Sequence, residues 1–182
     1  HNRLLYLSYV KPGPDSLGTL AVARGRYEDG RLYDLEEIFH AKASGNGSER
    51  SSMWGGRIAL DKKGYIYVTL GDRQWPSSGD LWAHPAQSLI NHNGTTIRLH
   101  ADGRVPTDNP LVGRENALPE IWTWGHRNAQ GIAIHPETGD VWSNEHGPQG
   151  GDEVNLLRSG SNYGWPVVGY GVNYRTGLAI HH

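Results

Sequence analysis

The chain has 182 residues, of which 36% are hydrophobic, so it is large enough for one ordinary domain with a modest core. Its 17 basic and 19 acidic residues leave a formal charge of -2, and no run of Lys or Arg could follow a phosphate backbone, which excludes nucleic acid as an expected partner. The sequence has no cysteine and no stretch of about 20 apolar residues, so disulfides, thiolate metal sites and a membrane-spanning helix are not expected.

The composition favours an all-β fold. There are 25 glycines, and 7 Trp and 9 Tyr stand against a single Phe, which is typical of many turns that join short aromatic-rich strands. No segment has the pattern of an amphipathic helix. Residues 73–94 lack a strand pattern and are predicted to form a long loop. Apolar runs flanked by Gly, Asp and Asn predict strands within residues 4–10, 18–27, 55–60, 65–72, 95–103, 120–125, 131–136 and 140–147.

One predicted hairpin occurs twice. Residues 57–71 and 131–147 both contain an apolar strand, a turn that ends at Gly64 or Gly139, and an aromatic strand. Two further strands are expected between the copies. A hairpin that recurs in this way is typical of the blades of a β-propeller, and a β-sandwich with similar hairpins is the alternative.

The number of blades raises a question of assembly. Propellers close with about four to eight blades of four strands, whereas residues 1–182, taken as one domain, supply two and a half to three. An open fan has unpaired edges. We therefore expect a half propeller that belongs to a longer protein or is completed by a homo-oligomer.

Two polar residues precede the second hairpin. Arg127 offers a planar fork of donors and Asn128 offers an amide, and both suit a planar, oxygen-rich ligand. The alternative is that they only bind loop carbonyls. Asp72 ends a predicted strand at a loop, where it is expected to orient a base or to cap a turn.

The stretch NEHGPQGGDEVNLL, residues 144–157, has more carboxylates and glycines than a tight hairpin needs. Gly147 and Pro148 offer carbonyl oxygens, which calcium prefers together with carboxylates. Asp152, Glu153 and Tyr163 are candidates to complete the shell of ligands. The alternative is a wide glycine-rich turn with solvated acids. Zinc is weakly supported, because the histidines are scattered.

Five motifs then occur together and in order: GGRIALDKKGYIYVTLGD, TTIRLHADGRVPTDNP, GHRNAQGIAIHPETG, EHGPQGGDEVNLL and GSNYGWP. On these motifs the chain resembles the soluble aldose (glucose/sorbosone) dehydrogenases that depend on pyrroloquinoline quinone (PQQ). The resemblance runs from about Met53 to Pro166. It implies a six-bladed β-propeller and an enzyme that transfers hydride from the anomeric carbon of an aldose to the quinone.

The resemblance also implies roles for individual residues. Arg127 and Asn128 match residues that contact the cofactor, and Asp72 matches the acid that orients a catalytic histidine. Gly147 and Pro148 match the carbonyl ligands of the calcium that polarises the quinone. Two further residues, Glu153 and Tyr163, match ligands of a structural calcium.

Two features depart from the family pattern. The position of the catalytic histidine holds Met53, and a thioether cannot act as a general base at neutral pH. His84 or His92 would be needed as a substitute, but nothing in the sequence supports either. The later blades, which add basic residues to the cofactor site in the family, have no counterpart in the chain.

Three functions are therefore compared. The first is a PQQ- and calcium-dependent aldose dehydrogenase with an unidentified electron acceptor. The second is a non-catalytic propeller that binds carbohydrate or protein, which Met53 and the short length favour. The third, least supported, is a glycoside hydrolase with paired carboxylates from Asp72, Glu145, Asp152 and Glu153. A periplasmic or secreted protein is expected, whose leader is absent from the chain.

Overall fold

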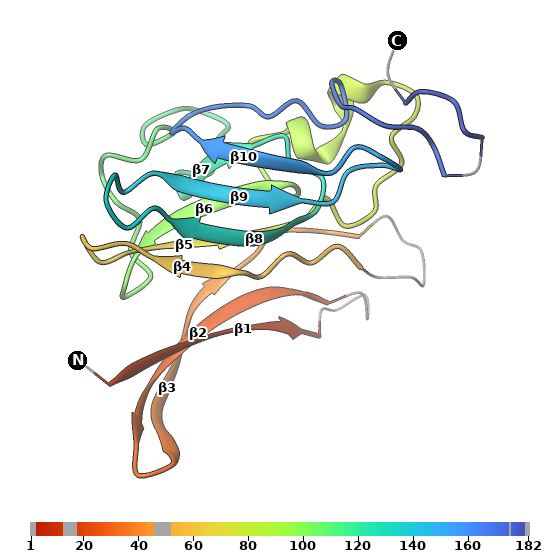
Figure 1. Ribbon diagram of the computed structural model, residues 1–182. Coiled ribbons are helices and arrows are strands. Elements are labelled where there is room, and N and C mark those ends of the chain that lie inside the picture. Colours follow the sequence, from red (N-terminus) through yellow and green to blue (C-terminus); the bar gives the residue numbers. More distant parts are fainter. Residues whose placement is uncertain (1–2, 13–17, 46–51, 175, 181–182) are drawn as a thin grey trace.

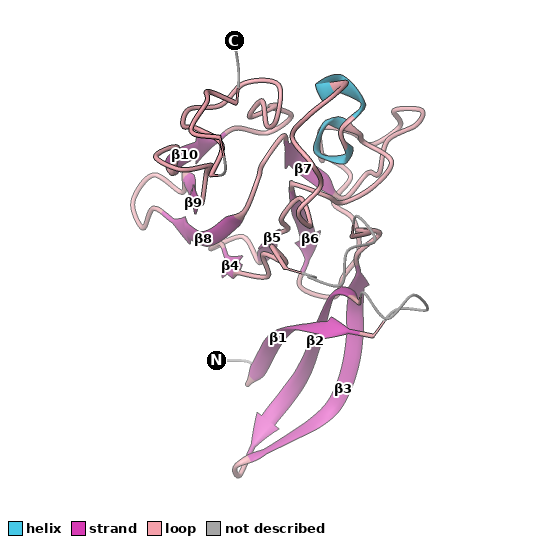
Figure 2. Cartoon of the chain, turned by 90° about the vertical axis from the view of Figure 1, so that its right-hand side faces the viewer, coloured by secondary structure: helices cyan, strands magenta, loops and turns pink. Residues whose placement is uncertain are grey.

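The computed structural model describes residues 3–12, 18–45, 52–174 and 176–180 and is all-β in these ranges. Its strands form three antiparallel sheets that lie one beside the next (Figures 1 and 2). Two short 3₁₀ helices lie in the segment predicted as a long loop. The elements are β1 (Leu4–Lys11), β2 (Thr19–Glu28), β3 (Arg31–His40), β4 (Ile58–Leu60), β5 (Tyr65–Thr69), η1 (Leu81–Ala83), η2 (Pro85–Gln87), β6 (Thr95–His100), β7 (Ile121–Trp124), β8 (Ala129–Ile134), β9 (Val141–Glu145) and β10 (Glu153–Leu157).

The first sheet has the order β1-β2-β3. β2 is the most buried of the three, because both neighbours pair with it and its apolar side chains pack against the second sheet. Leu20 and Val22 of β2 join Ile66, Val68 and Ile97 of the second sheet in one core. β3 was not predicted, because most of its side chains are exposed and its sequence does not alternate.

The second sheet, β4-β5-β6-β7, is a complete four-stranded blade. The turn between β4 and β5 is held by Asp61, whose Oδ1 accepts the N–H groups of Lys63 and Tyr65. Gly64 has a positive φ of 84°, which only glycine adopts readily. The β4–β5 hairpin is the first copy of the repeat predicted from the sequence.

The third sheet, β10-β9-β8, contains the second copy of the hairpin in β8 and β9. β6 and β7 separate the two copies, as predicted. Tyr67 and Trp122 of the second sheet pack with Ile132, Val141 and Leu157 of the third, and the Tyr67 and Trp122 rings meet edge to face at 4.9 Å. The second sheet therefore packs against the first on one side and the third on the other, as in neighbouring blades of a propeller, whereas a β-sandwich has two sheets, so the β-sandwich alternative is wrong.

Long connections gather at one end of the sheets. The segment that carries η1 and η2, the β9–β10 connection and the C-terminal segment lie together there (Figure 1). Gln87 donates to the carbonyl of Trp165, and Gln149 exchanges two backbone hydrogen bonds with Val172. Binding sites on β scaffolds usually lie in such loops. Within the described ranges, no helix is long and apolar enough to cross a membrane.

Candidate functional site

A cleft of about 430 Å³ opens among these loops. Residues that are far apart in the sequence line it, and they come from the segment before β4, the connections after β5, β7 and β9, and the C-terminal segment. They include Met53, Asp72, Arg127, Pro148 and Trp165. Four of these five positions are those that the sequence singled out. The fold therefore brings Asp72, Arg127 and Pro148 to one cavity, with Met53 at its wall.

Asp72 is the most perturbed acid of the cleft. Its Oδ1 accepts the backbone N–H of Gln74 at 2.8 Å, and its Oδ2 accepts the indole N–H of Trp165 at 2.8 Å. Burial raises the pKa of Asp72 to about 7, although these two hydrogen bonds and the charge of Arg127 act to lower it. Asp72 therefore exchanges a proton near neutral pH. The acid at this position orients a histidine in the family, whereas the Asp72 carboxylate contacts Trp165. Its hydrogen bond with the N–H of Gln74 is a turn cap, which was the alternative expected from the sequence.

Arg127 holds the cleft together from both its main chain and its side chain. Its carbonyl accepts the N–H of Asp72 at 2.8 Å. Its guanidinium Nη1 donates to the carbonyls of His146 and Gly147, at 2.9 and 2.5 Å. The guanidinium carbon lies 5.3 Å from the centroid of the Trp165 ring, within the range of a cation–π contact. A cation and a flat aromatic surface thus share one wall of the cleft.

Asn128 is placed differently from its neighbour. Its side-chain Oδ1 accepts Gln130 Nε2 at 2.6 Å, and it is not among the residues that line the cleft. Its main chain nevertheless takes part in the site, since its carbonyl accepts the N–H of His146 at 3.1 Å. The predicted contact between Asn128 and a cofactor stays a prediction.

Glu145 and His126 form a buried pair beneath Arg127. Glu145 Oε1 lies 2.8 Å from His126 Nδ1, and His126 Nε2 lies 2.9 Å from the hydroxyl of Thr123. Burial acts to raise the pKa of Glu145. The opposing effects are larger and lower the pKa: they are the charge and hydrogen bond of His126 and the backbone N–H groups of Arg127 and Asn128. The carboxylate is therefore ionised at neutral pH. This network was missed in the sequence, although the alternation in β9 puts Val141, Ser143 and Glu145 on its buried face.

The backbone of the turn after β9 is closely packed. A Cβ atom added to Gly147 would stand 1.8 Å from the carbonyl oxygen of Gly151, so only glycine fits. The N–H of Gly147 donates to Oδ1 of the exposed Asp152, and the carbonyl of Pro148 accepts the N–H of Gly151. Asp152 thus stabilises the turn.

Glu153 and Tyr163 lie beside this turn. Both line a small cavity of about 10 Å³, together with Arg127, Glu145 and Gly147, and a cavity of this size holds about one water-sized particle. The Tyr163 hydroxyl donates to the carbonyl of Leu156 and accepts the N–H of Arg158, so it faces away from an ion site. Only the main-chain carbonyl of Tyr163 is left as a ligand. No group of three or more His, Asp or Glu side chains in the described ranges is arranged to hold a metal.

Neither histidine considered as a substitute for Met53 lies in the cleft. His84 Nδ1 accepts the N–H of Ala86, and its Nε2 lies 3.4 Å from the carbonyl of Trp75. His92 is fully buried between the N–H of Lys42 and the carboxylate of Glu120. The residues that line the cleft include no histidine.

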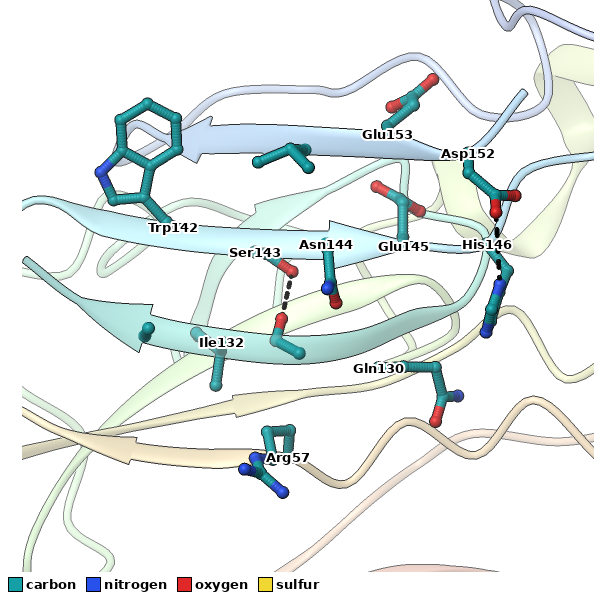
Figure 3. A pocket seen from close by; sticks show the side chains of 13 residues that line it. Arg57, Gln130, Ile132, Trp142, Ser143, Asn144, Glu145, His146, Asp152 and Glu153 are labelled. Carbon is teal, nitrogen blue, oxygen red and sulfur yellow. Dashed lines mark hydrogen bonds and ion pairs between the residues drawn. The ribbon is translucent and has the colours of Figure 1, made fainter. Parts of the chain in front are cut away.

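A second, broader hollow of about 750 Å³ lies over the outer face of β8, β9 and β10 (Figure 3). Trp142 and Val154 are exposed there, at 39% and 73%, and His146 and Asp152 meet at one end. Blades of a propeller pack face to face, so this is the face that a following blade would cover. We interpret the hollow as a packing surface.

Comparison with known proteins agrees with this architecture. The family described as Glucose / Sorbosone dehydrogenase matches residues 1–182. This match is longer than the resemblance seen in the sequence motifs, which runs from about Met53 to Pro166. Aldose sugar dehydrogenase YliI of Escherichia coli (strain K12) is 38% identical over 176 residues, which are 95% of this chain and 44% of that protein. Quinoprotein glucose dehydrogenase B of Acinetobacter calcoaceticus is 37% identical over 128 residues, which are 63% of this chain and 26% of that protein.

The fold matches solved structures equally well. The crystal structure of the soluble aldose sugar dehydrogenase from Escherichia coli in the apo-form superposes with a TM-score of 0.84 at 36% identity. The match covers 98% of this chain and 49% of that one. The three sheets thus correspond to half of a six-bladed propeller, and the chain spans less than half the length of the curated relatives it matches.

Proposed function

Because the chain belongs to the glucose/sorbosone dehydrogenase family, we propose that it forms the PQQ- and calcium-binding half of an aldose dehydrogenase. The observation that carries the proposal is the single cleft shared by Asp72, Arg127, Pro148 and Trp165. The name of one relative, a quinoprotein glucose dehydrogenase, agrees with this cofactor and substrate class. Aldose sugars are the proposed substrates.

The residues of the cleft fit a planar anionic quinone. The Arg127 guanidinium supplies a fork of donors for carboxylate or quinone oxygens, and the Trp165 ring supplies a flat apolar surface. When bound, the quinone accepts hydride from the sugar, and calcium polarises a quinone carbonyl. The chain's own part is to bind and orient these groups and to exclude water from the reacting carbon.

Calcium would depend on backbone oxygens. The carbonyls of Gly147 and Pro148 each accept one hydrogen bond, from Arg127 and Gly151, and a carbonyl oxygen keeps a second lone pair. Such oxygens are ordinary calcium ligands. Glu153 and the Tyr163 carbonyl are proposed for a second, structural calcium, and the small cavity beside them supports this assignment.

The weakest part of the chemistry is proton removal from the sugar hydroxyl. Met53 lines the cleft at the position where the family has a histidine, and its sulfur cannot accept a proton. Asp72 holds a proton with a pKa of about 7, but only 1% of its surface is exposed. We therefore propose that the chain positions the cofactor well and takes up the proton poorly.

Met53 also favours a second candidate, a non-catalytic propeller that binds carbohydrate or protein. The same cleft would then serve for binding alone. The glycoside hydrolase alternative gains nothing from the geometry, since Glu145 is buried and all its hydrogen-bonding capacity is used by neighbouring groups.

The proposal also includes further blades that complete the propeller ring. The outer faces of the first and third sheets expose apolar side chains such as Tyr27, Leu35, Trp142 and Val154. Further blades, from a longer chain or from a second copy in a homo-oligomer, would cover them. A periplasmic or secreted location is likewise proposed.

The test is dye-coupled oxidation of a panel of aldoses by the chain, supplied with calcium and PQQ, with a no-sugar control. We expect little turnover by the wild-type chain and a large increase in the Met53→His variant. If the variant binds PQQ and still turns over no sugar, a histidine at residue 53 is not sufficient for catalysis by this half of the ring, and the expected increase is wrong. If neither protein binds PQQ, the dehydrogenase proposal fails and a binding function remains.

A further inference from the structure

Glu145 connects the two segments of the candidate cofactor site, which are the segment with Arg127 and Asn128 and the turn with Gly147 and Pro148. It is the last residue of β9, and only His146 separates it from Gly147 and Pro148. Its side chain points back into the protein, toward the segment that carries His126, Arg127 and Asn128. One carboxylate thus lies between the proposed quinone-binding residues and the proposed calcium-binding carbonyls.

The four hydrogen bonds of Glu145 divide between its two oxygens. Oε2 accepts the backbone N–H groups of Arg127 at 2.6 Å and of Asn128 at 3.3 Å. Oε1 accepts Nδ2 of Asn155 at 3.0 Å and lies 2.8 Å from His126 Nδ1. One oxygen therefore fixes the main chain of the site, and the other fixes the carboxylate itself.

Other contacts reinforce the same geometry. The Arg127 guanidinium donates to the carbonyls of His146 and Gly147, and the N–H of His146 donates to the carbonyl of Asn128. The segment around Arg127 and the turn after β9 are thus linked in three ways. The link through Glu145 adds to these three and is made by a buried carboxylate side chain.

Glu145 is a buried acid and not a solvent-exposed one. Only 4% of its side chain is exposed, and the side chain of His126 is fully buried. A buried carboxylate is costly unless its charge is compensated by donors, and here two backbone N–H groups of the site provide half of that compensation. The energy that keeps Glu145 buried therefore also holds Arg127 and Asn128 in place.

We propose that Glu145 is a positioning residue, which fixes the main chain of Arg127 and Asn128 opposite the carbonyls of Gly147 and Pro148 before the cofactor arrives. This rests on the proposed function. Preorganised sites bind their ligands more tightly, because less conformational entropy is lost on binding. Glu145 does not line the larger cleft proposed for the quinone, so its substitution should weaken quinone binding without removing a group from the lining of that cleft.

The chain offers a matched control. Glu120 is a second acid paired with a buried histidine, since its Oε1 lies 2.9 Å from Nε2 of His92, and it does not line the cleft. Glu120→Gln and Glu145→Gln both replace the acid of a buried His–Glu pair by an amide. Only Glu145→Gln also changes the acceptor of the Arg127 and Asn128 N–H groups, because glutamine has one acceptor oxygen where glutamate has two.

The experiment has two readouts on folded protein, as judged by circular dichroism. The first is calorimetric titration of PQQ in calcium buffer, where Glu145→Gln should raise the Kd about 10- to 100-fold, the usual cost of removing an outer-shell partner. Glu120→Gln should stay within about twofold of wild type. The second readout needs no cofactor: the Arg127 and Asn128 amides should exchange with D₂O slowly in the wild type and faster in Glu145→Gln.

Each outcome decides something. Equal PQQ affinity of folded Glu145→Gln and wild type would overturn the positioning role while leaving the proposed function intact. If the wild type binds no PQQ, the proposed function itself fails, and the positioning role with it. Should Glu145→Gln not fold, the wild-type exchange rates still decide: rapid exchange of both amides in the absence of cofactor would show that the site is not preformed.

Discussion

The raised pKa of Asp72 makes folding stability depend on pH in a defined range. Asp72 has a pKa of about 7 in the folded chain and an ordinary value of 3.8. Between these values the unfolded chain releases the proton while the folded chain keeps it. Stability therefore falls as the pH rises from about 4 to about 7, and the loss is complete above pH 7. In Asp72→Asn this contribution is absent.

The size of the effect follows from the two pKa values. Between pH 5 and pH 8 the free energy of unfolding of the wild-type chain should fall by roughly 2–3 kcal/mol relative to that of Asp72→Asn. For a domain of this size, that corresponds to roughly 5–10 °C in Tm. The Asn side chain can accept from only one of the Gln74 and Trp165 donors, which adds an offset between the two proteins that does not depend on pH.

Denaturant unfolding of both proteins at a series of pH values measures the effect, because groups that titrate equally in the two proteins cancel in the difference. A third variant, Trp165→Phe, removes a hydrogen bond that lowers the pKa of Asp72, so its stability should continue to fall to higher pH. Curves for wild type and Asp72→Asn that stay parallel from pH 5 to pH 8 would refute the reasoning.

Three further predictions concern the cleft. Met53→His should raise dye-coupled aldose oxidation about 10²- to 10⁴-fold, the usual contribution of a general base, and unchanged kcat in a protein that binds PQQ would argue against it. Arg127→Lys keeps the charge but loses the planar fork, and calorimetry should show PQQ affinity reduced about 10- to 100-fold; full affinity would mean that Arg127 is only a structural link. Gly147→Ala places a Cβ 1.8 Å from the Gly151 oxygen, so the free energy of unfolding should fall by about 1–3 kcal/mol. The same variant should lose calcium-dependent PQQ binding. The control Gly139→Ala has open space and only its positive φ to overcome, at about 1 kcal/mol, and equal losses in both variants would contradict the crowding argument.

The strand pattern of the sequence predicted much of the fold. Alternating and aromatic runs located eight of the strands, and the repeated hairpins at Gly64 and Gly139 indicated a propeller. β3 was missed because it lies at a sheet edge with polar side chains on both faces, so burial imposes no alternation on it. β10 was missed because its acidic start, at Glu153, was interpreted as part of a metal-binding turn.

The sequence predicted which residues line the site but not which groups they contact. Asp72, Arg127 and Pro148 were singled out, and they do line one cleft. The partner of Asp72 was not predictable, because Trp165 is 93 residues away and only the packing of the blades brings its indole to the carboxylate. The role of Glu145 was hidden for a similar reason, since two of its four partners are backbone N–H groups, which leave no mark in the sequence.

The most direct test of the account is calorimetric titration of PQQ into the wild-type chain, once with calcium and once with a chelator. The account predicts saturable binding near one PQQ per chain with calcium, and strong weakening when the chelator removes it. The absence of binding in calcium, by a chain shown to be folded, would contradict the claim that the cleft of Asp72, Arg127 and Pro148 is a cofactor site.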